Sequence, residues 1–291
     1  SVIGLDPRPE YIPPAIMEKH ISLKGATAEA AADAYYEFNC GLIDAISSFV
    51  PAVKPQSAFY ELLGPCGVET LKKTISYAKK KGLYVIADVK RNDIGTTAKA
   101  YSEAYLGYVE IGGVRHRAFD CDSITVSSYL GSDGIAPFLE ICKRDEKTIF
   151  TLVKTSNKSS GELQDLKAGE NRVYELVGKM LESLSEDTIG KYGYGACGAV
   201  VGATYPSELK SLRKLLKNTF FLVPGYGAQG GSAEDVAGAF DDKGIGAIIN
   251  SSRAVICAWM KTGGDGTDYM AAAAKEAEKM RDDITKYCFC K

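Results

Sequence analysis

Short apolar runs recur along the chain, and stretches with helical spacing separate them. Eight runs have the length of buried strands, at residues 2–7, 51–56, 83–87, 122–126, 148–153, 198–203, 220–223 and 245–249. Helical patterns follow them, at residues 27–49, 67–81, 98–110, 135–143, 171–192, 207–216, 233–240 and 268–286. Regular alternation of strand and helix predicts parallel pairing with right-handed crossovers.

Eight such units predict an α/β fold of the (β/α)8 TIM barrel class. The alternative, an open doubly wound sheet, is disfavoured because no GxGxxG fingerprint follows the first strand. We expect one catalytic domain over residues 1–291, since barrels of about 250 residues form single domains. The first strand begins almost at residue 1, which leaves open whether residues precede it.

Composition narrows the function classes. A net charge of −2 gives no electrostatic support for binding nucleic acid or a membrane surface. There is no apolar run of membrane-spanning length and no basic-then-apolar N-terminal signal, so we expect a cytoplasmic protein. The two histidines have no acid or thiol at metal-ligand spacing, which argues against a His-based zinc site.

The eight cysteines are dispersed, and several lie within apolar runs. This distribution predicts reduced, mostly buried thiols rather than a disulfide-rich scaffold. We expect Cys288 and Cys290 to lie on an exposed, frayed tail. A metal site or a disulfide at this pair remains an alternative.

Charged side chains crowd the end of the third predicted strand. Asp88 and Lys90 are two residues apart and should project from the same face, while Asp93 falls in the turn before a predicted helix start near residue 96. With Lys54 they form an alternating Lys–Asp–Lys–Asp array. A lysine between two carboxylates stays protonated, so Lys90 is predicted to donate a proton rather than act as a base. A purely structural salt-bridge network is the alternative.

Polar residues also follow other strands, where a barrel carries its active site. They are Asp6, Ser156, Gln229 and Arg253, in addition to Lys54, Asp88 and Lys90. The glycine-rich loop 225–231 can offer backbone N–H groups to an anion, and Arg253 suits bidentate phosphate contact. We therefore expect a phosphate site after strands seven and eight, against the alternative of a flexible turn. The polar stretch 158–169 is typical of a binding loop or lid.

The run Asp-Val-Lys-Arg-Asn-Asp-Ile-Gly-Thr-Thr at residues 88–97 resembles the signature of the orotidine 5′-phosphate decarboxylase family, in its longer bacterial and protist subgroup. The resemblance extends over nearly the whole chain, because matching segments follow other strands in order. They are residues 4–7, 52–56, 155–157, 224–231 and 250–253. It implies a lyase that decarboxylates orotidine 5′-monophosphate to uridine 5′-monophosphate without cofactor or metal, the last step of de novo pyrimidine synthesis.

The resemblance also implies residue roles. The catalytic residues would be Lys54, Asp88, Lys90 and Asp93, with Asp88 beside the substrate carboxylate and Lys90 protonating C6. Residues that bind the substrate would be Asp6 at the ribose, Ser156 at the pyrimidine edge, and Thr97, Pro224, Gln229, Ser252 and Arg253. Gln229 and Arg253 would hold the phosphate. Asp93 and Thr97 would reach the partner's site, so the implied enzyme is a homodimer.

Two alternatives remain open. One is a decarboxylase resembling the 3-keto-L-gulonate 6-phosphate enzymes, which shares the Asp-x-Lys-x-x-Asp segment but uses Mg²⁺. Lys54 argues against a metal at that place. The other is a non-catalytic nucleotide-binding barrel. One residue departs from the family pattern, since Lys158 stands where a proline commonly follows Thr-Ser-Asn, and this departure concerns the loop on the pyrimidine side.

Overall fold

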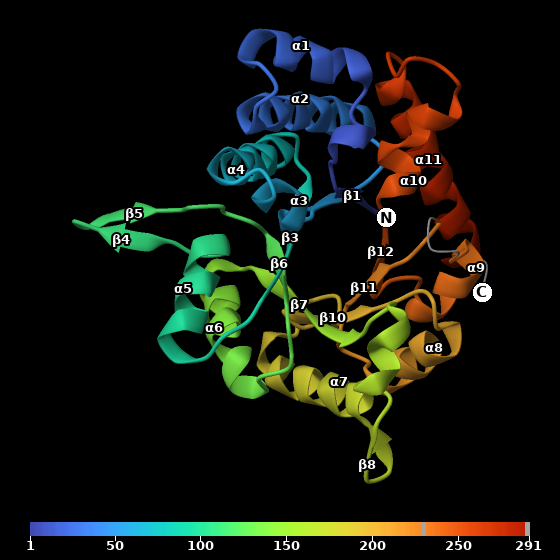
Figure 1. The fold of residues 1–291 in the computed structure, drawn as a ribbon. Coiled ribbons are helices and arrows are strands. Elements are labelled where there is room, and N and C mark those ends of the chain that lie inside the picture. The colour runs from blue at the N-terminus through green and yellow to red at the C-terminus, as the bar shows by residue number, and fades with distance from the viewer. Residues whose placement is uncertain (228–230, 289–291) are drawn as a thin grey trace. The chain divides into compact units, whose positions relative to one another are not determined.

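Eight parallel strands close into a barrel in the computed structural model, which describes residues 1–227 and 231–288. Their order around the barrel is β1-β12-β11-β10-β7-β6-β3-β2. This closed order confirms the predicted (β/α)8 class (Figure 1). The bounds are β1 Val2–Leu5, β2 Ala52–Pro55, β3 Tyr84–Arg91, β6 Ser123–Val126, β7 Thr148–Lys154, β10 Cys197–Val201, β11 Phe221–Pro224 and β12 Ala247–Ser251.

The chain divides into two compact units, which are described separately. The first contains residues 1–89 and 251–283, and the second contains residues 90–250 and 284–291. Strand β3 runs from the first unit into the second. Among the described residues, no helix combines the length and apolar character needed to cross a membrane.

Helices α1, α2 and α4 lie in succession in the first unit (Figure 1). The side chain of Thr27 accepts the N–H of Ala30, so α2 begins where the sequence predicts. Helix α1 was not predicted, because none of its residues is buried and it lacks an apolar stripe. Helix bounds are α1 Pro14–Lys24, α2 Ala28–Ile46, α3 Ser57–Glu61, α4 Pro65–Lys80, α10 Arg253–Ile256 and α11 Tyr269–Cys288, with 3-10 turns at Pro9–Tyr11 and Ala258–Lys261.

The helices of the second unit are shorter than predicted. Helix α5 starts close to the expected position but ends at Tyr105, and residues 109–116 form a hairpin that projects as an arm in Figure 1. Positive φ angles at Gly112 and Gly113 permit its tight turn, so the expected helix to residue 110 was wrong. The helices are α5 Gly95–Tyr105, α6 Ala136–Asp145, α7 Val173–Leu184, α8 Pro206–Leu215 and α9 Ala233–Val236.

Small elements fill the remaining connections. The hairpin strands are β4 Val109–Ile111 with β5 Val114–His116, and β8 Lys167–Ala168 with β9 Asn171–Arg172. Four 3-10 turns are described in this unit, at Ser132–Gly134, Lys158–Glu162, Glu186–Thr188 and Ala237–Ala239. The expected helix 171–192 therefore ends at Leu184, and the expected loop 158–169 contains a 3-10 turn and half of a hairpin.

The cysteines are free thiols in the described part of the chain, and five of them are buried. The expectation that Cys288 lies on an exposed tail is wrong. It is the last residue of α11 and is buried, because the helix continues further than its sequence pattern indicates. Cys290 lies outside the described residues.

Candidate active site

Asp88 receives two donors from the neighbouring strand in the first unit. Lys54 Nζ lies 2.7 Å from Asp88 Oδ2, and Gln56 Nε2 lies 2.9 Å from the same oxygen. Gln56 and Asp88 form a parallel bridge at the ends of β2 and β3. Positions 54 and 56 are two apart and face the same way, so both reach one carboxylate. The role of Gln56 was not predicted, although its spacing from Lys54 is the signal that could have found it.

The Lys54–Asp88 pair is almost excluded from solvent, with side-chain exposures of 6% and 10%. Burial alone would lower the pKa of the Lys54 ammonium. The carboxylates of Asp88 and Asp6 and the hydrogen bond to Asp88 outweigh burial and raise that pKa above its ordinary value of 10.5. Lys54 is therefore a fixed positive charge at neutral pH, and Asp6 contributes to its field.

Asp6 follows β1 directly, and a buried polar network lies next to it. The Tyr60 hydroxyl donates to the carbonyl oxygen of Leu5 at 3.2 Å, and the Asn39 amide donates to Tyr60 at 2.9 Å. Burial and then the Asp6 carboxylate raise the pKa of Tyr60, so its hydroxyl keeps the proton that it donates. Tyr60 fixes the end of β1 and was not predicted from the sequence.

Ser252 and Arg253 enter the first unit after β12. Gly4 makes room for Ser252, because a Cβ atom at position 4 would lie 1.8 Å from Ser252 Oγ. Arg253 is the first residue of α10 and is exposed. Asp6, Lys54, Asp88, Ser252 and Arg253 are thus the predicted site residues that belong to this unit.

Lys90 begins the second unit in a left-handed backbone conformation, with φ of 45°. This conformation is unfavourable for a residue with a Cβ atom and recurs at functional sites. The Lys90 N–H donates to Thr125 Oγ1 at 2.9 Å, which holds the end of β3 against β6. The Lys90 and Thr97 side chains are exposed, whereas Asp93 is half-buried and its Oδ1 accepts the N–H of Ile94.

Ser156 lies beyond β7 against the end of β10. A Cβ atom at Gly202 would lie 2.9 Å from Ser156 Cβ and 3.0 Å from its backbone nitrogen. Only glycine at position 202 leaves the Ser156 backbone where it is. Lys154, two residues before Ser156, is buried and forms an ion pair of 2.7 Å with Asp165. No role was predicted for this lysine, because a lysine at a strand end is usually solvated.

Backbone hydrogen bonds close the base of the glycine-rich loop. Gly227 N–H donates to Gly231 O at 2.8 Å, and Gly231 N–H donates to Gly225 O at 3.3 Å. Gly225 and Gly227 have φ of 107° and 75°, which favour glycine. Pro224 ends β11 and its carbonyl accepts the N–H of Ala203. Gln229, the predicted phosphate ligand, lies outside the described residues.

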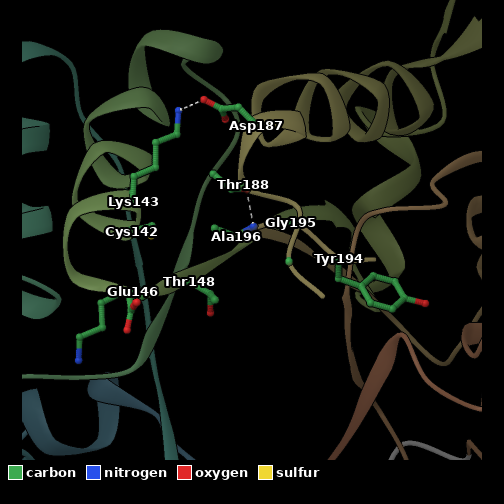
Figure 2. A pocket seen from close by; sticks show the side chains of 11 residues that line it. Cys142, Lys143, Glu146, Thr148, Asp187, Thr188, Tyr194, Gly195 and Ala196 are labelled. Carbon is green, nitrogen blue, oxygen red and sulfur yellow. Dashed lines mark hydrogen bonds and ion pairs between the residues drawn. The ribbon is translucent and has the colours of Figure 1, made fainter. Parts of the chain in front are cut away.

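A pocket of about 500 Å³ opens in the second unit away from these residues (Figure 2). It is lined by Thr148 at the start of β7 and by Ala196 just before β10, so it lies at the amino ends of these strands. Lys143 and Asp187 form an ion pair of 2.6 Å at its edge. In barrels of this class the amino end of the strands contributes stability, whereas chemistry occurs at the carboxyl end. The pocket contains none of the predicted site residues.

Among residues 1–227 and 231–288, no cluster of three or more His, Cys, Asp or Glu side chains is placed to hold a metal ion.

The fold and the strand-end charges define a class, the (β/α)8-barrel enzymes whose polar residues gather at the carboxyl ends of the strands. Residues 2–260 match the model of a family described as "Orotidine 5′-phosphate decarboxylase / HUMPS family". The chain belongs to this family.

Named relatives agree with the family match. The orotidine 5′-phosphate decarboxylase of Rhodopirellula baltica is 47% identical over 258 residues, which cover 89% of this chain and 83% of that protein. The structure of Leishmania donovani OMP decarboxylase is 30% identical with a TM-score of 0.73, over 100% of this chain and 94% of that chain. The structure of Leishmania donovani UMP synthase is 32% identical with a TM-score of 0.75, and this chain spans 54% of it.

Proposed function

We propose that this chain decarboxylates orotidine 5′-monophosphate to uridine 5′-monophosphate and CO2, without a cofactor. The observation that carries the proposal is the buried Lys54–Asp88 pair at the carboxyl ends of β2 and β3. We infer that this pair places fixed charges where the substrate carboxylate would lie. Charges fixed before the substrate arrives stabilise a developing charge without reorganisation.

The reaction requires one bond to break and one to form. The bond between C6 and the carboxylate breaks, CO2 leaves, and the electron pair stays on C6 as a carbanion. The Lys90 ammonium then donates a proton to C6, and the neutral amine is reprotonated from water. Asp88 lies beside the substrate carboxylate in this proposal, and the Lys54 ammonium keeps Asp88 ionised. Lys54, Asp88, Lys90 and Asp93 together form the proposed Lys–Asp–Lys–Asp array.

Substrate groups far from C6 supply binding energy. Asp6 and Lys54 contact the ribose, Ser156 contacts the pyrimidine edge, and Arg253 holds the phosphate. Binding energy from contacts remote from the reacting bond can drive loop closure and orient the substrate. Thr97, Pro224, Gln229 and Ser252 complete the proposed binding set.

The Mg²⁺-dependent alternative would need a metal beside Asp88. Lys54 already supplies a cation at 2.7 Å from that carboxylate, which favours the cofactor-free reaction. Dialysis against EDTA should leave turnover of orotidine 5′-monophosphate unchanged. Loss of turnover that Mg²⁺ restores would support the metal-dependent reaction instead.

The direct test follows the loss of orotidylate absorbance on adding purified protein. We expect turnover by the wild type and a loss of at least about 10²-fold in kcat for Lys90→Ala, because the proton donor is removed. Binding of uridine 5′-monophosphate without turnover would show a non-catalytic nucleotide-binding barrel. Near-wild-type turnover by Lys90→Ala would contradict the assigned proton donor.

We further propose a homodimer in which Asp93 and Thr97 serve the partner's site. Mixing Lys90→Ala with Asp93→Ala protein tests this arrangement. In a mixed dimer, one site would hold both wild-type residues, so activity should recover to about a quarter of the wild type after subunit exchange. If each site used its own Asp93, no activity would return.

The proposal treats residues 1–291 as one catalytic domain in the cytoplasm. The cysteines that the structure describes are free and mostly buried, which supports a reducing compartment.

A further inference from the structure

Lys154 is among the most deeply buried side chains of the second unit, with 1% of its surface exposed. Its ammonium lies 2.7 Å from Asp165 Oδ1. The rings of Tyr174 and Tyr205 flank it, at 5.4 Å and 4.8 Å from Nζ to the ring centroids. Burying an ammonium is costly unless it is paired. The Asp165 carboxylate and the two aromatic rings therefore offset the cost of burying the Lys154 ammonium.

The partners of Lys154 come from separate segments of the chain. Asp165 belongs to the segment after β7, Tyr174 is in the first turn of α7, and Tyr205 precedes α8. One ammonium therefore links the β7–α7 connection to the connection between β10 and α8.

The segment 155–165 is closed by a second set of bonds next to this ion pair. Gln164 Oε1 accepts the N–H of Thr155 at 2.9 Å, and Gln164 Nε2 donates to Thr155 Oγ1 at 2.8 Å. Thr155 Oγ1 donates to Asn157 Oδ1 at 2.6 Å. Ser156 lies between these two bonded residues, so its backbone is held from both sides.

A β-bulge directs Lys154 to this position. Leu152 pairs with Val200, but Lys154 pairs with Val201, so β7 carries one extra residue at Val153. Bulges redirect side chains and recur beside active sites. The Lys154 carbonyl also accepts the N–H of Gly202 at 2.8 Å, and Gly202 is the residue against which Ser156 lies.

We propose that Lys154 is a positioning residue, whose ion pair with Asp165 holds the 155–165 segment so that Ser156 meets the pyrimidine of the ligand. The inference rests on the proposed function, because that function places a pyrimidine at Ser156. Lys154 itself touches neither ligand nor reacting atoms. Its effect should therefore appear in recognition of the base and not of the phosphate.

Two ligands separate these effects. Uridine 5′-monophosphate carries the base, ribose and phosphate, whereas ribose 5-phosphate lacks the base. Binding of both is measured by calorimetry to the wild type, Lys154→Met and Lys167→Met. Lys167→Met is the matched control, since Lys167 is an exposed lysine of the same connection.

We expect Lys154→Met to weaken the binding of uridine 5′-monophosphate by about tenfold, the size of one lost hydrogen bond. Binding of ribose 5-phosphate should weaken by less than about twofold. The control should bind both ligands as the wild type does. Equal weakening of both ligands by Lys154→Met, or no weakening of either, would overturn the proposal. An equal effect of Lys167→Met would overturn it as well.

Gln164→Ala provides a second variant if Lys154→Met fails to fold, because it opens the same segment without leaving a buried charge. It should show the same selective loss for the ligand with the base, and an unselective loss would count against the proposal. Absence of turnover by the wild type would refute the proposed function alone, since the ligand comparison requires no turnover.

Discussion

Two buried lysines, one in each compact unit, lie at or next to the last residue of a barrel strand. Each forms an ion pair of 2.7 Å with its own aspartate. Lys54 pairs with Asp88 of the neighbouring strand, and both side chains are almost fully buried. Lys154 is buried even more deeply, but its partner Asp165 is 34% exposed and lies in a connection between elements. The same chemical pair thus occurs once between two paired strands and once between a strand and a connecting segment.

The difference shows what each pair can do. Strand pairing fixes the backbones of Lys54 and Asp88, so their charges are positioned before a ligand binds. Asp165 lies outside the barrel strands, and its segment is held by the ion pair together with the hydrogen bonds between Gln164 and Thr155. One pair therefore presents charge to the substrate, while the other positions a neighbouring residue.

The largest expected difference concerns stability. Lys54→Met leaves the Asp88 carboxylate buried without the lysine charge, although Gln56 still donates to it. We expect the free energy of unfolding to fall by about 3–5 kcal/mol. Lys154→Met leaves an aspartate that already reaches solvent, so we expect a loss of about 1–2 kcal/mol. Urea unfolding of the ligand-free proteins measures both. A larger loss for Lys154→Met would contradict the comparison.

Turnover should separate the pairs next. Lys54→Met removes a fixed charge from the reacting centre and should lower kcat by about 10²–10³-fold. Lys154→Met acts through Ser156, so kcat at saturating orotidine 5′-monophosphate should stay within about tenfold of the wild type. Steady-state kinetics over a wide substrate range tests this. Equal losses of kcat would place Lys154 in the chemistry itself.

The first pair was predictable because its residues follow local rules. Apolar runs located β2 and β3, and the position of Lys54 and Asp88 near the carboxyl ends of these strands predicted that the two would meet. The second donor, Gln56, was not predicted. The partner of Lys154 lies 11 residues away across a connection without periodicity, and the bulge in β7 depends on pairing with β10. Such contacts are properties of the tertiary fold.

The same limit applies to the fold. The eight strands were predicted because continuous burial gives continuous apolar runs. Helix α1 was missed because none of its residues is buried, and the 109–116 hairpin was missed because its strand residues are exposed and resemble a continued helix. Buried elements show an apolar pattern in the sequence, whereas exposed elements show little pattern from which they could be predicted.

Two glycines extend the comparison to smaller effects. Gly4 faces the Ser252 side chain in the first unit, whereas Gly202 faces the Ser156 backbone in the second. Gly202→Ala should displace Ser156. Binding of uridine 5′-monophosphate should then weaken by about tenfold, with little change in the binding of ribose 5-phosphate. Gly4→Ala should displace Ser252, which directly precedes the proposed phosphate ligand Arg253. It should therefore weaken binding of both ligands alike, because both carry the phosphate. Calorimetric titration of each variant with both ligands would reveal any reversal of this pattern.

The smallest effect is a pH dependence of the Lys54 pair. Its neighbouring carboxylates raise the folded pKa of Lys54 above 10.5 despite burial, so the stabilisation is fully present below pH 10.5. Above that pH the unfolded chain loses the lysine proton while the folded chain keeps it. Unfolding is then favoured, and the stability difference between the wild type and Lys54→Met should narrow, by at most about 1.4 kcal/mol per pH unit.

Urea unfolding of both proteins between pH 7 and pH 11.5 checks this dependence. The upper limit lies about one unit above the ordinary lysine pKa. Tyrosines and other lysines titrate in the same range, but they are common to both proteins and cancel in the difference. A difference that stays constant to pH 11.5 would mean that the pair contributes through packing of the lysine stem rather than through its charge.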